Sequence, residues 1–314
     1  METEAAKEKT LSLQEIGLHD RQRINPVLTS TGIVSNFTCF EQLYAYLWKP
    51  ANHLFLASCD GKQRILLYRN SNLKDIRILF SQDQDDSDFI QGIKGYFNPK
   101  YIAYNLISEK PSVSDPSKTA VRDELIIDVP TIANLDDSKL GKDYRYFKKN
   151  HPGIQYRQAK QDDKHGIYDF LNRWSQRESD KRGSRVSVDN VKRYVDLFFD
   201  SGDIEIGVVI DDGKVIGLTA FSPHPSDTSL AVSTFSMVDR GYKQLGVFTK
   251  VEQVRSMQQK SYTKAVIGGT ESEDKTSFKM RFMKNGNKNT YYSLEVYRDP
   301  SLSVSPNYLR DFWA

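Results

Sequence analysis

The chain has 314 residues, of which 38% are hydrophobic, 11% aromatic and 27% charged. Its length suits two ordinary domains, and its 16 Phe and 17 Tyr exclude an intrinsically disordered chain, which would lack large apolar side chains. The 44 basic and 41 acidic residues give a formal net charge of +3, too small to indicate a nucleic-acid or membrane partner without a local basic patch.

Targeting and metal-binding signals are missing from the sequence. Cys39 and Cys59 are too few for a disulfide framework. The charged start, METEAAKEKT, lacks the apolar segment of a signal peptide, and no apolar run approaches the ~20 residues of a membrane helix. The 5 His share no metal-ligand spacing with one another or with the cysteines. We therefore expect a cytoplasmic protein with no transmembrane segment and no metal site.

The first half of the chain is predicted to alternate between strands and helices. The patterns indicate a flexible tail over 1–12, a helix over 40–48, strands over 53–59, 63–69, 76–81 and 100–107, a helix over 87–97 and a loop over 108–123. The first two strands flank Asp60-Gly61. An Asp-Gly pair is a strong hairpin signal because both turn residues need a positive φ.

The second half repeats this order. Helices are predicted over 164–179, 187–199, 246–257 and 277–285, and strands over 204–210, 214–221, 230–239, 264–268 and 290–298. Asp212-Gly213 joins the first two of these strands, as Asp60-Gly61 does in the first half. This match favours two similar α+β units in tandem; two hairpins that arose independently are the alternative.

A glycine-containing turn leads from one predicted strand into the next helix. The strand ends near Asp239, and the turn holds Gly241 and Gly246. Unpaired N–H groups and the positive end of a helix dipole receive phosphate or carboxylate groups, and Arg240 and Lys243 add positive charge. The turn fits neither GxxxxGK[ST] nor GxGxxG, so a turn with no ligand remains the alternative.

Two charged stretches are further candidates. YRYFKKNHP (144–152) carries Arg145, Lys148 and Lys149, which suit either an anionic ligand or a solvated helix face. In IGGTESEDKTSFKMRFMKNG (267–286), acidic residues precede Lys279 and Arg281. These two cations are two residues apart and cannot share one helix face. The alternative for this stretch is a solvated helix with internal ion pairs.

The motifs resemble those of a known superfamily. YKQLGVFTK is similar to the acyl-carrier loop (Q/R)xxGx(G/A) of GNAT acyltransferases, with Lys243 at the first position and Phe248 at the last. More specifically, residues 30–298 resemble the family named for the C-terminal domain of phosphatidylglycerol lysyltransferase. That resemblance rests on SNFTCFEQLYAYL, DELIIDVPTIANLDDSKLGKDYRYFKKNHP, GVFTKVEQ and the acidic-then-FKMRF stretch.

The resemblance implies an α+β, tandem GNAT-like acyltransferase fold whose N-terminal copy is degenerate. We place the two domains at 13–135 and 136–314, with the acyl-donor cleft in the second. Family members, and the related Fem-type transferases, move an amino acid from aminoacyl-tRNA. We therefore expect transfer of an aminoacyl group to an amine or hydroxyl of a lipid headgroup or small molecule. A CoA-dependent N-acyltransferase and a non-catalytic protein that binds an anionic ligand or partner are the alternatives.

The same resemblance implies the site residues. The acyl donor would be bound by Arg240, Lys243, Gln244, Gly246 and Val247. The tRNA acceptor end would contact Arg145, Lys148 and Lys149. No DNA partner or separate cofactor is implied, and the oligomeric state stays open.

The strand over 264–268 is expected to diverge from its neighbour and deliver its end, with Glu271, to the cleft. The resemblance favours Lys279 for the inward place, where a cation would meet phosphate, a tRNA 3′ end or the developing oxyanion of acyl transfer. Asp239 or Glu271 would accept the acceptor's proton.

Overall fold

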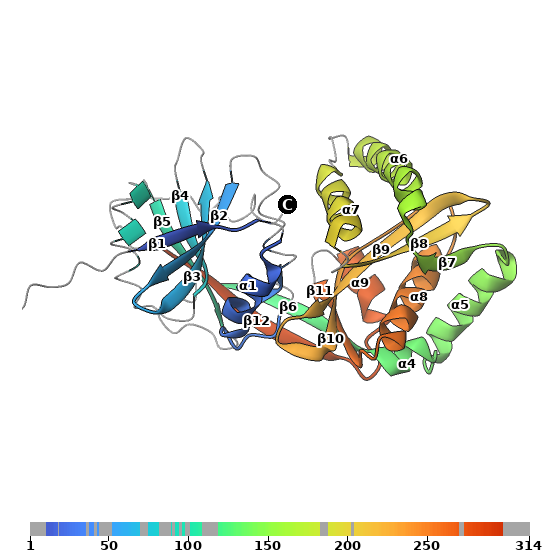
Figure 1. The fold of residues 1–314 in the computed structure, drawn as a ribbon. Coiled ribbons are helices and arrows are strands. Elements are labelled where there is room, and N and C mark those ends of the chain that lie inside the picture. Colours follow the sequence, from blue (N-terminus) through green and yellow to red (C-terminus); the bar gives the residue numbers. More distant parts are fainter. Residues whose placement is uncertain are drawn as a thin grey trace, which may run out of the picture. The chain divides into compact units, whose positions relative to one another are not determined.

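The computed structural model describes most of the chain in two compact units. The described residues are 11–17, 19–35, 38–40, 43, 52–69, 75–81, 89, 92–93, 96–97, 101–108, 119–182, 188–201, 204–269 and 273–297. Most of the tail predicted over 1–12, the helix over 40–48 and the loop over 108–123 lies outside them. Figure 1 shows the elements along the chain.

Each compact unit is built from more than one chain segment. The first contains residues 1–33, 46–121 and 291–314, and the second contains residues 34–45 and 122–290. After the short segment 34–45, the chain enters the second unit again within strand β6 (Thr119–Asp128) and returns to the first within β12 (Asn287–Tyr297). These boundaries differ from the single domain boundary after residue 135 that we placed from the sequence.

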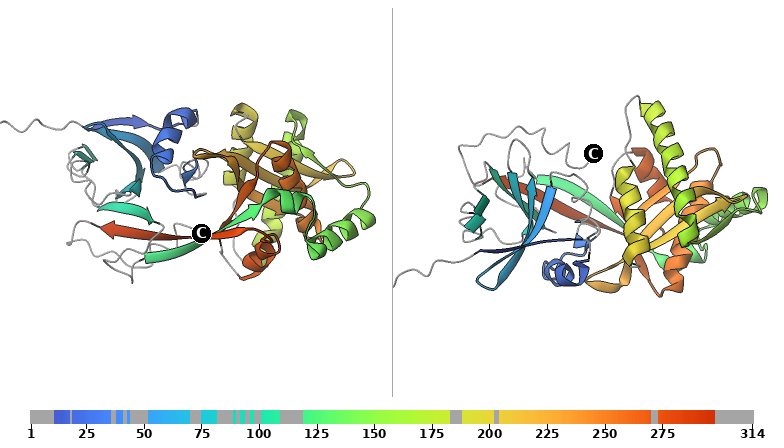
Figure 2. Two further views of the ribbon diagram at one scale, coloured as in Figure 1. Left: turned by 90° about the horizontal axis from the view of Figure 1, so that it is seen from below. Right: turned by 45° about the horizontal axis from the view of Figure 1, so that its top comes forward.

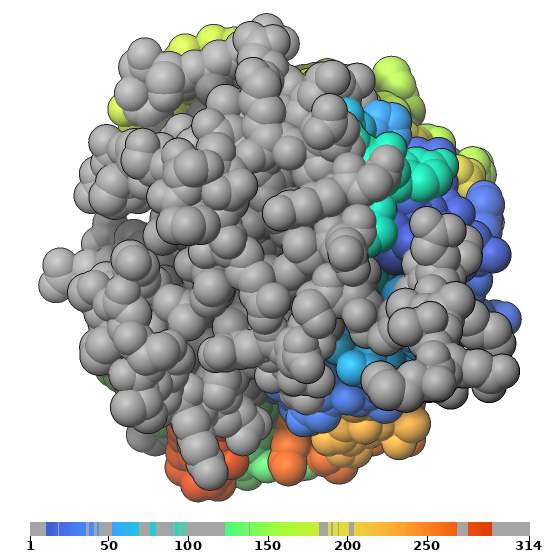
Figure 3. Space-filling model, turned by 90° about the vertical axis from the view of Figure 1, so that its left-hand side faces the viewer, coloured from blue at the N-terminus to red at the C-terminus, as the bar shows by residue number. Residues whose placement is uncertain are grey.

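The first unit is a mixed sheet with helix α1 (Arg21–Thr29). Its strands are β1 (Ser12–Glu15), β2 (Asn52–Cys59), β3 (Lys62–Arg69), β4 (Asp75–Ser81) and β5 (Tyr101–Ser108), followed in the sheet by β12. β4 and β5 are parallel, and the other neighbouring pairs are antiparallel. Blue residues from the first part of the chain reach the surface at one edge of the face shown in Figure 3. β1 is largely exposed.

The second unit repeats this strand order. Its strands lie in the order β7 (Gln155–Gln158), β8 (Glu205–Asp211), β9 (Lys214–His224), β10 (Asp227–Val238), β11 (Lys264–Gly269) and β6. β10 and β11 are parallel, and the other neighbouring pairs are antiparallel. The agreement in order and direction supports the duplication. It also shows an exchange of final strands, since β6 follows β5 but pairs with β11, whereas β12 follows β11 but pairs with β5.

Both Asp-Gly hairpins form as predicted, each between two antiparallel strands. The φ angles are 47° and 74° at Asp60 and Gly61, and 46° and 76° at Asp212 and Gly213. These positive values match the right-handed twist of the flanking strands, which is why the Asp-Gly pair selects this turn.

Helices cover both faces of the sheet in the second unit (Figures 1 and 2). One face carries α4 (Val129–Ala133), α5 (Ser138–Asn150) and α8 (Leu245–Gln259), and the other carries α6 (Lys164–Arg182) and α7 (Asp189–Ser201). The short 3₁₀ helix η3 (Gln161–Asp163) precedes α6, and α9 (Glu273–Met280) precedes β12.

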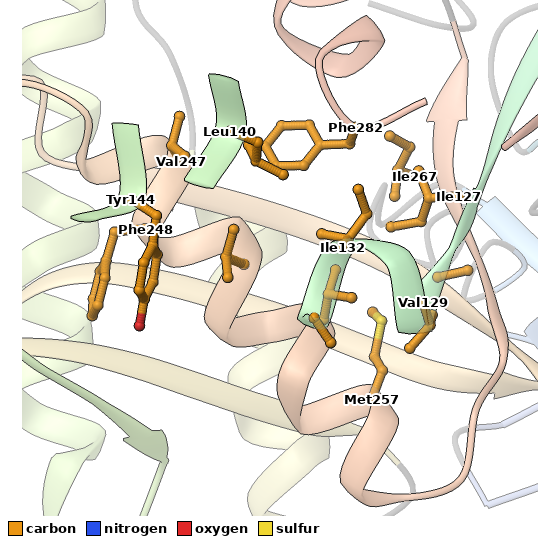
Figure 4. Close-up of a cluster of buried hydrophobic side chains, with 14 of the residues drawn as sticks. Ile127, Val129, Ile132, Leu140, Tyr144, Val247, Phe248, Met257, Ile267 and Phe282 are labelled. Carbon is orange, nitrogen blue, oxygen red and sulfur yellow. The ribbon is translucent and has the colours of Figure 1, made fainter. Parts of the chain in front are cut away.

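The core of the second unit forms around α8, whose apolar residues recur at helical spacing as predicted. Phe248 stacks on Phe147 and Tyr144 of α5, with ring centres 4.7 and 5.7 Å apart. Ile267 of β11 and Phe282 face the same cluster (Figure 4). Side chains of this size each contribute about 1.5–3 kcal/mol on burial, so the cluster fixes α8 against the sheet beside the candidate site.

Candidate functional site

The parallel strands β10 and β11 separate in the middle of the second unit. They pair at Leu230–Lys264, Ala231–Ala265 and Val232–Val266. Both strands run on, to Val238 and Gly269, without further pairing to each other in this fully described stretch. Backbone groups beyond Val232 are thereby left for another partner. The divergence expected from the sequence at this strand is present.

A β-bulge lies where the two strands begin to separate. In the pairing of β10 with β9, Ser233 lies opposite Phe221 and Phe235 opposite Ala220, which leaves Thr234 as the extra residue. Bulges of this kind increase the local twist and are common beside active sites. Within the described part of the chain, the buried hydroxyl of Thr234 has no hydrogen-bond partner. Such a group calls for an explanation, of which a missing ligand or water is one.

Lys250 of α8 lies beneath this bulge. It is 6% exposed, and its Nζ donates hydrogen bonds to the Ser233 hydroxyl (3.0 Å) and the Gln253 side-chain oxygen (2.6 Å). The Gln253 amide in turn donates to the carbonyl of Ala220 at 3.0 Å. No carboxylate pairs with Lys250 among the described residues. Burial, and then the charge of Lys279, lower the pKa of Lys250 to about 7.

Lys279 of α9 lies on the β11 side of the gap, near Lys250. Its Nζ lies 3.3 Å from the point where a Cβ on Gly268 would project, and Gly268 has a φ of 82°. Glycine therefore meets two needs there: the backbone conformation and the close approach of the ammonium. The predicted inward cation Lys279 thus lies beside the end of β11 and acts electrostatically on Lys250.

Arg281 and Lys279 point in different directions, because residues two positions apart on a helix do not share a face. From the sequence we expected one of the two cations to line the cleft and the other to stay in solvent. Arg281 instead forms an ion pair with Asp143 of α5, and both side chains are about a quarter exposed. Glu271, the other residue predicted in this stretch, lies outside the described residues.

Asp239 follows directly after β10 and is held by an ion pair. Its Oδ1 lies 2.6 Å from the guanidinium of Arg177 and accepts a hydrogen bond from the Gly241 N–H at 2.9 Å. Burial works to raise the pKa of Asp239, but the Gly241 N–H and the Arg177 guanidinium outweigh it and lower that pKa. A carboxylate held in this way is a weak proton acceptor.

Several N–H groups at the turn before α8 bond within the chain. The Gln244 carbonyl accepts from the N–H groups of Val247 and Phe248, both at 3.1 Å, and the Tyr242 carbonyl accepts from Leu245 at 3.3 Å. Gln244 itself has a φ of 65°. These N–H groups, which would bind a pyrophosphate in an anion-binding turn, therefore have partners within the chain.

The predicted donor-binding residues of this turn do not converge on one point. Arg240 lies 3.4 Å from Glu178 of α6, and the Nζ of Lys243 lies 5.7 Å from the ring centre of Tyr146. Gly246 lets the ring of Phe278 approach its backbone closely, because a Cβ there would meet that ring at 3.4 Å. The side chain of Val247 is buried in the core.

Helix α5 presents an exposed basic face. Asp137 caps its start by accepting from the Leu140 N–H at 2.7 Å. The outward side chains recur at a spacing of three or four residues and are Lys139, Lys142, Arg145 and Lys149. Lys148 is also exposed, and its Nζ lies 5.7 Å from the ring centre of Phe248. The three predicted cations therefore share one helix, apart from Lys250 and Lys279 in the sequence and in their contacts.

Sequence reasoning missed Lys250 and its two partners. One signal was present, since Lys250 occupies a position of the apolar series Val247, Val251 and Val254 at helical spacing. A lysine inside such a series is buried when the helix packs on its apolar face.

Comparisons with known proteins identify the fold. No family model and no curated protein matches the sequence. The C-terminal domain of a putative lysylphosphatidylglycerol synthetase from Agrobacterium fabrum is 11% identical, with 87% of this chain and 91% of that chain covered and a TM-score of 0.56. The structure of FemX is 9% identical, with 90% and 96% covered and a TM-score of 0.60.

A tandem GNAT protein from the clavulanic acid biosynthesis pathway is 11% identical, with 93% of this chain and 100% of that chain covered and a TM-score of 0.52. No helix among the described residues is long and apolar enough to cross a membrane. The structural likenesses agree with the resemblance to lysyltransferase and Fem-type proteins noted in the sequence. The chain has the tandem GNAT fold.

Proposed function

We propose that this protein is an acyltransferase that moves an aminoacyl group from aminoacyl-tRNA to an acceptor amine or hydroxyl. The observation that carries the proposal is the separation of β10 from β11 with Lys250 and Lys279 beside the gap. It is supported by the fold shared with the C-terminal domain of a putative lysylphosphatidylglycerol synthetase. In such a gap, the unpaired backbone groups of the strands can hydrogen-bond an extended donor, and Lys279 supplies a positive charge beside it.

The chemistry asks little of the protein. The ester of aminoacyl-tRNA is already activated, so the enzyme mainly orients the acceptor and stabilises the oxyanion that forms when the acceptor attacks the ester carbonyl. Lys279, whose ammonium lies against Gly268 at the end of β11, is the group we assign to that oxyanion. The exposed basic face of α5 suits the tRNA backbone, which is bound chiefly through phosphates.

A CoA-dependent N-acyltransferase is the second candidate. The turn from β10 into α8, with Gly246 in the first helical turn, is the observation that favours it. Two features weigh against it: N–H groups of Leu245, Val247 and Phe248 have partners within the chain, and Phe248 occupies a position where a small residue would let a phosphate approach. The fold shared with the tandem GNAT protein from the clavulanic acid biosynthesis pathway, whose structure was solved without AcCoA, supports this candidate.

Binding measurements on the full chain separate these donors. We expect aminoacyl-tRNA to bind with an affinity that falls steeply with salt, because phosphate contacts release counterions. Lys149→Glu should weaken that binding, whereas Lys62→Glu, an exposed lysine in the β2–β3 hairpin, should not. Tight acetyl-CoA binding in calorimetry without salt-sensitive tRNA binding would transfer the proposal to the CoA reaction. If neither donor binds, the non-catalytic alternative stands.

A further inference from the structure

We propose that Lys250 accepts, through the hydroxyl of Ser233, the proton of an acceptor ammonium group, so that the acceptor of the reaction is an amine. This inference rests on the proposed function and names both a proton acceptor and the acceptor class. Its structural basis is a hydrogen-bonded connection from the gap between β10 and β11 to a buried amine.

Ser233 is the link between the gap and the buried amine. It is the first residue of β10 beyond the last pair with β11, its side chain is only half-buried, and it immediately precedes the bulged Thr234. Its hydroxyl lies 3.0 Å from the Nζ of Lys250. That hydroxyl donates to the side-chain oxygen of Gln253 at 3.3 Å while it accepts from Lys250. When Lys250 is neutral, its lone pair takes the hydroxyl proton instead, and the Ser233 oxygen accepts from the ammonium. An ammonium in the gap therefore reaches Lys250 without Lys250 leaving the core.

The surroundings keep Lys250 ready to take up a proton. Its contacts on β10 and on its own helix, Ser233 and Gln253, are neutral, and Gln253 is held by a backbone carbonyl of β9. Among the described residues, the charged group that acts on it is Lys279 of α9. The nearby charged residues of α8, Glu252 and Arg255, bond to each other and to Tyr144 of α5.

A purely structural role does not account for this arrangement. Lys250 occupies an apolar position, where leucine or methionine would pack without burying an amine. A buried lysine paired with a carboxylate would be an ordinary ion pair, but no such partner occurs among the described residues. Burial and the charge of Lys279 lower its pKa to about 7, which is the range in which a general base works best at neutral pH.

The proton balance favours an amine acceptor. At neutral pH an alkyl amine is an ammonium and has no lone pair with which to attack, whereas a hydroxyl already has one. The ammonium passes one proton through Ser233 to neutral Lys250. The free amine then forms the C–N bond, the ester C–O bond breaks, and the second proton leaves the nitrogen for the departing ribose oxygen. Lys250 releases its proton to water, so that ammonium and ester give amide, alcohol and a proton.

The first test measures the protonation of Lys250 in the ligand-free full chain. Protein labelled with carbon-13 at the lysine ε-carbons is titrated by NMR, and the Lys250 signal is identified by its loss in Lys250→Met. We expect a midpoint close to pH 7. A midpoint near 10 would overturn the proposal whatever the donor, because Lys250 would then be protonated throughout the working range.

The second test follows transfer from lysyl-tRNA, or from acetyl-CoA, to methylamine and to glycerol as model acceptors. At pH 7, Lys250→Met and Ser233→Ala should lower transfer to methylamine about 10²-fold. The loss should shrink to a few-fold near pH 10, where methylamine sheds its own proton. Lys264→Met, an exposed lysine of β11, should leave the rates unchanged.

These outcomes separate this inference from the proposed function. Transfer by the wild type with losses in Lys250→Met that are equal at every pH would overturn the proton-acceptor role alone. Preferred transfer to glycerol would overturn the amine assignment. If neither donor supports transfer to either acceptor, the proposed function fails and this inference fails with it.

Discussion

The buried amine of Lys250 should make the stability of the second unit depend on pH in a calculable way. The folded state holds its pKa at about 7, against about 10.5 in an unfolded chain. Between these values the unfolded chain binds a proton that the folded chain has released, so the free energy of unfolding rises with pH. The contribution is fully present above about 10.5, and it is lost as pH falls through 7.

The magnitude follows from the same two values. Between pH 7 and pH 9, proton linkage through Lys250 should raise the free energy of unfolding by about 2 kcal/mol. Lys250→Met should remove this pH dependence. It also removes the hydrogen bonds that Lys250 donates to Gln253 and Ser233, and losing them costs about 1–3 kcal/mol. That cost does not vary with pH, so the slope isolates the titration of the amine.

Urea unfolding of the wild type and Lys250→Met at intervals between pH 6 and pH 9 measures the difference. This range avoids the titration of the tyrosines, which affects stability only at higher pH. Burial is the main cause that raises the pKa of Tyr144, for example, to about 12. Lys264→Met, with an exposed lysine on β11, is the matched control and should follow the wild type. Equal slopes for the wild type and Lys250→Met would show that Lys250 is an ordinary charged lysine and would refute the reasoning.

Four further substitutions test the gap and the core beside it. Lys279→Ala should lower turnover about 10²-fold with little change in melting temperature, whereas Arg281→Ala should leave turnover nearly intact and cost at most about 1 kcal/mol in urea unfolding, through its ion pair with Asp143. Phe248→Ala should lower the free energy of unfolding by about 3–5 kcal/mol, measured by urea unfolding, because it empties the stack on α5. Gly268→Ala should lower both stability and turnover, because its φ of 82° is strained for alanine and its Cβ meets Lys279; unchanged turnover would argue against Lys279 at the oxyanion.

Local patterns predicted much of the fold. The two Asp-Gly turns were found because their residues meet a backbone requirement that few others meet. The long helix α8 was found because its apolar residues repeat at helical spacing. The exchange of β6 and β12 was missed, since strand patterns indicate which face is buried but not which strand is the neighbour. For the same reason two boundaries of the compact units, after residues 121 and 290, fall inside the strands β6 and β12.

The candidate site could be predicted only where neighbours are close in sequence. Lys279 and Arg281 could be assigned to different directions because helical spacing separates them. Lys250 and Gln253 are three residues apart on α8, but Ser233 comes from strand β10. The group of three therefore exists only in the folded chain. Asp239 looked like a general base from its place after a strand, but the ion pair with Arg177, 62 residues earlier, argues against that role.

The two lysines at the gap should be coupled, and their coupling can be measured without a substrate. Like charges disfavour each other's charged form, and the charge of Lys279 adds to burial in lowering the pKa of Lys250. Lys279→Met should therefore raise the NMR midpoint of Lys250 above 7. The midpoint should remain below its usual value, because burial, the larger cause, is unchanged.

Arg281→Met is the matched control, since this cation pairs with Asp143 and not with the buried amine. It should leave the Lys250 midpoint where it is. If Lys279→Met also leaves the midpoint unchanged, the ammonium of Lys279 does not act on Lys250, and the oxyanion and proton-acceptor roles would have to be assigned to separate places. A raised midpoint would instead mean that one cation serves both steps: it stabilises the oxyanion directly and, by keeping Lys250 neutral, it prepares the acceptor of the proton.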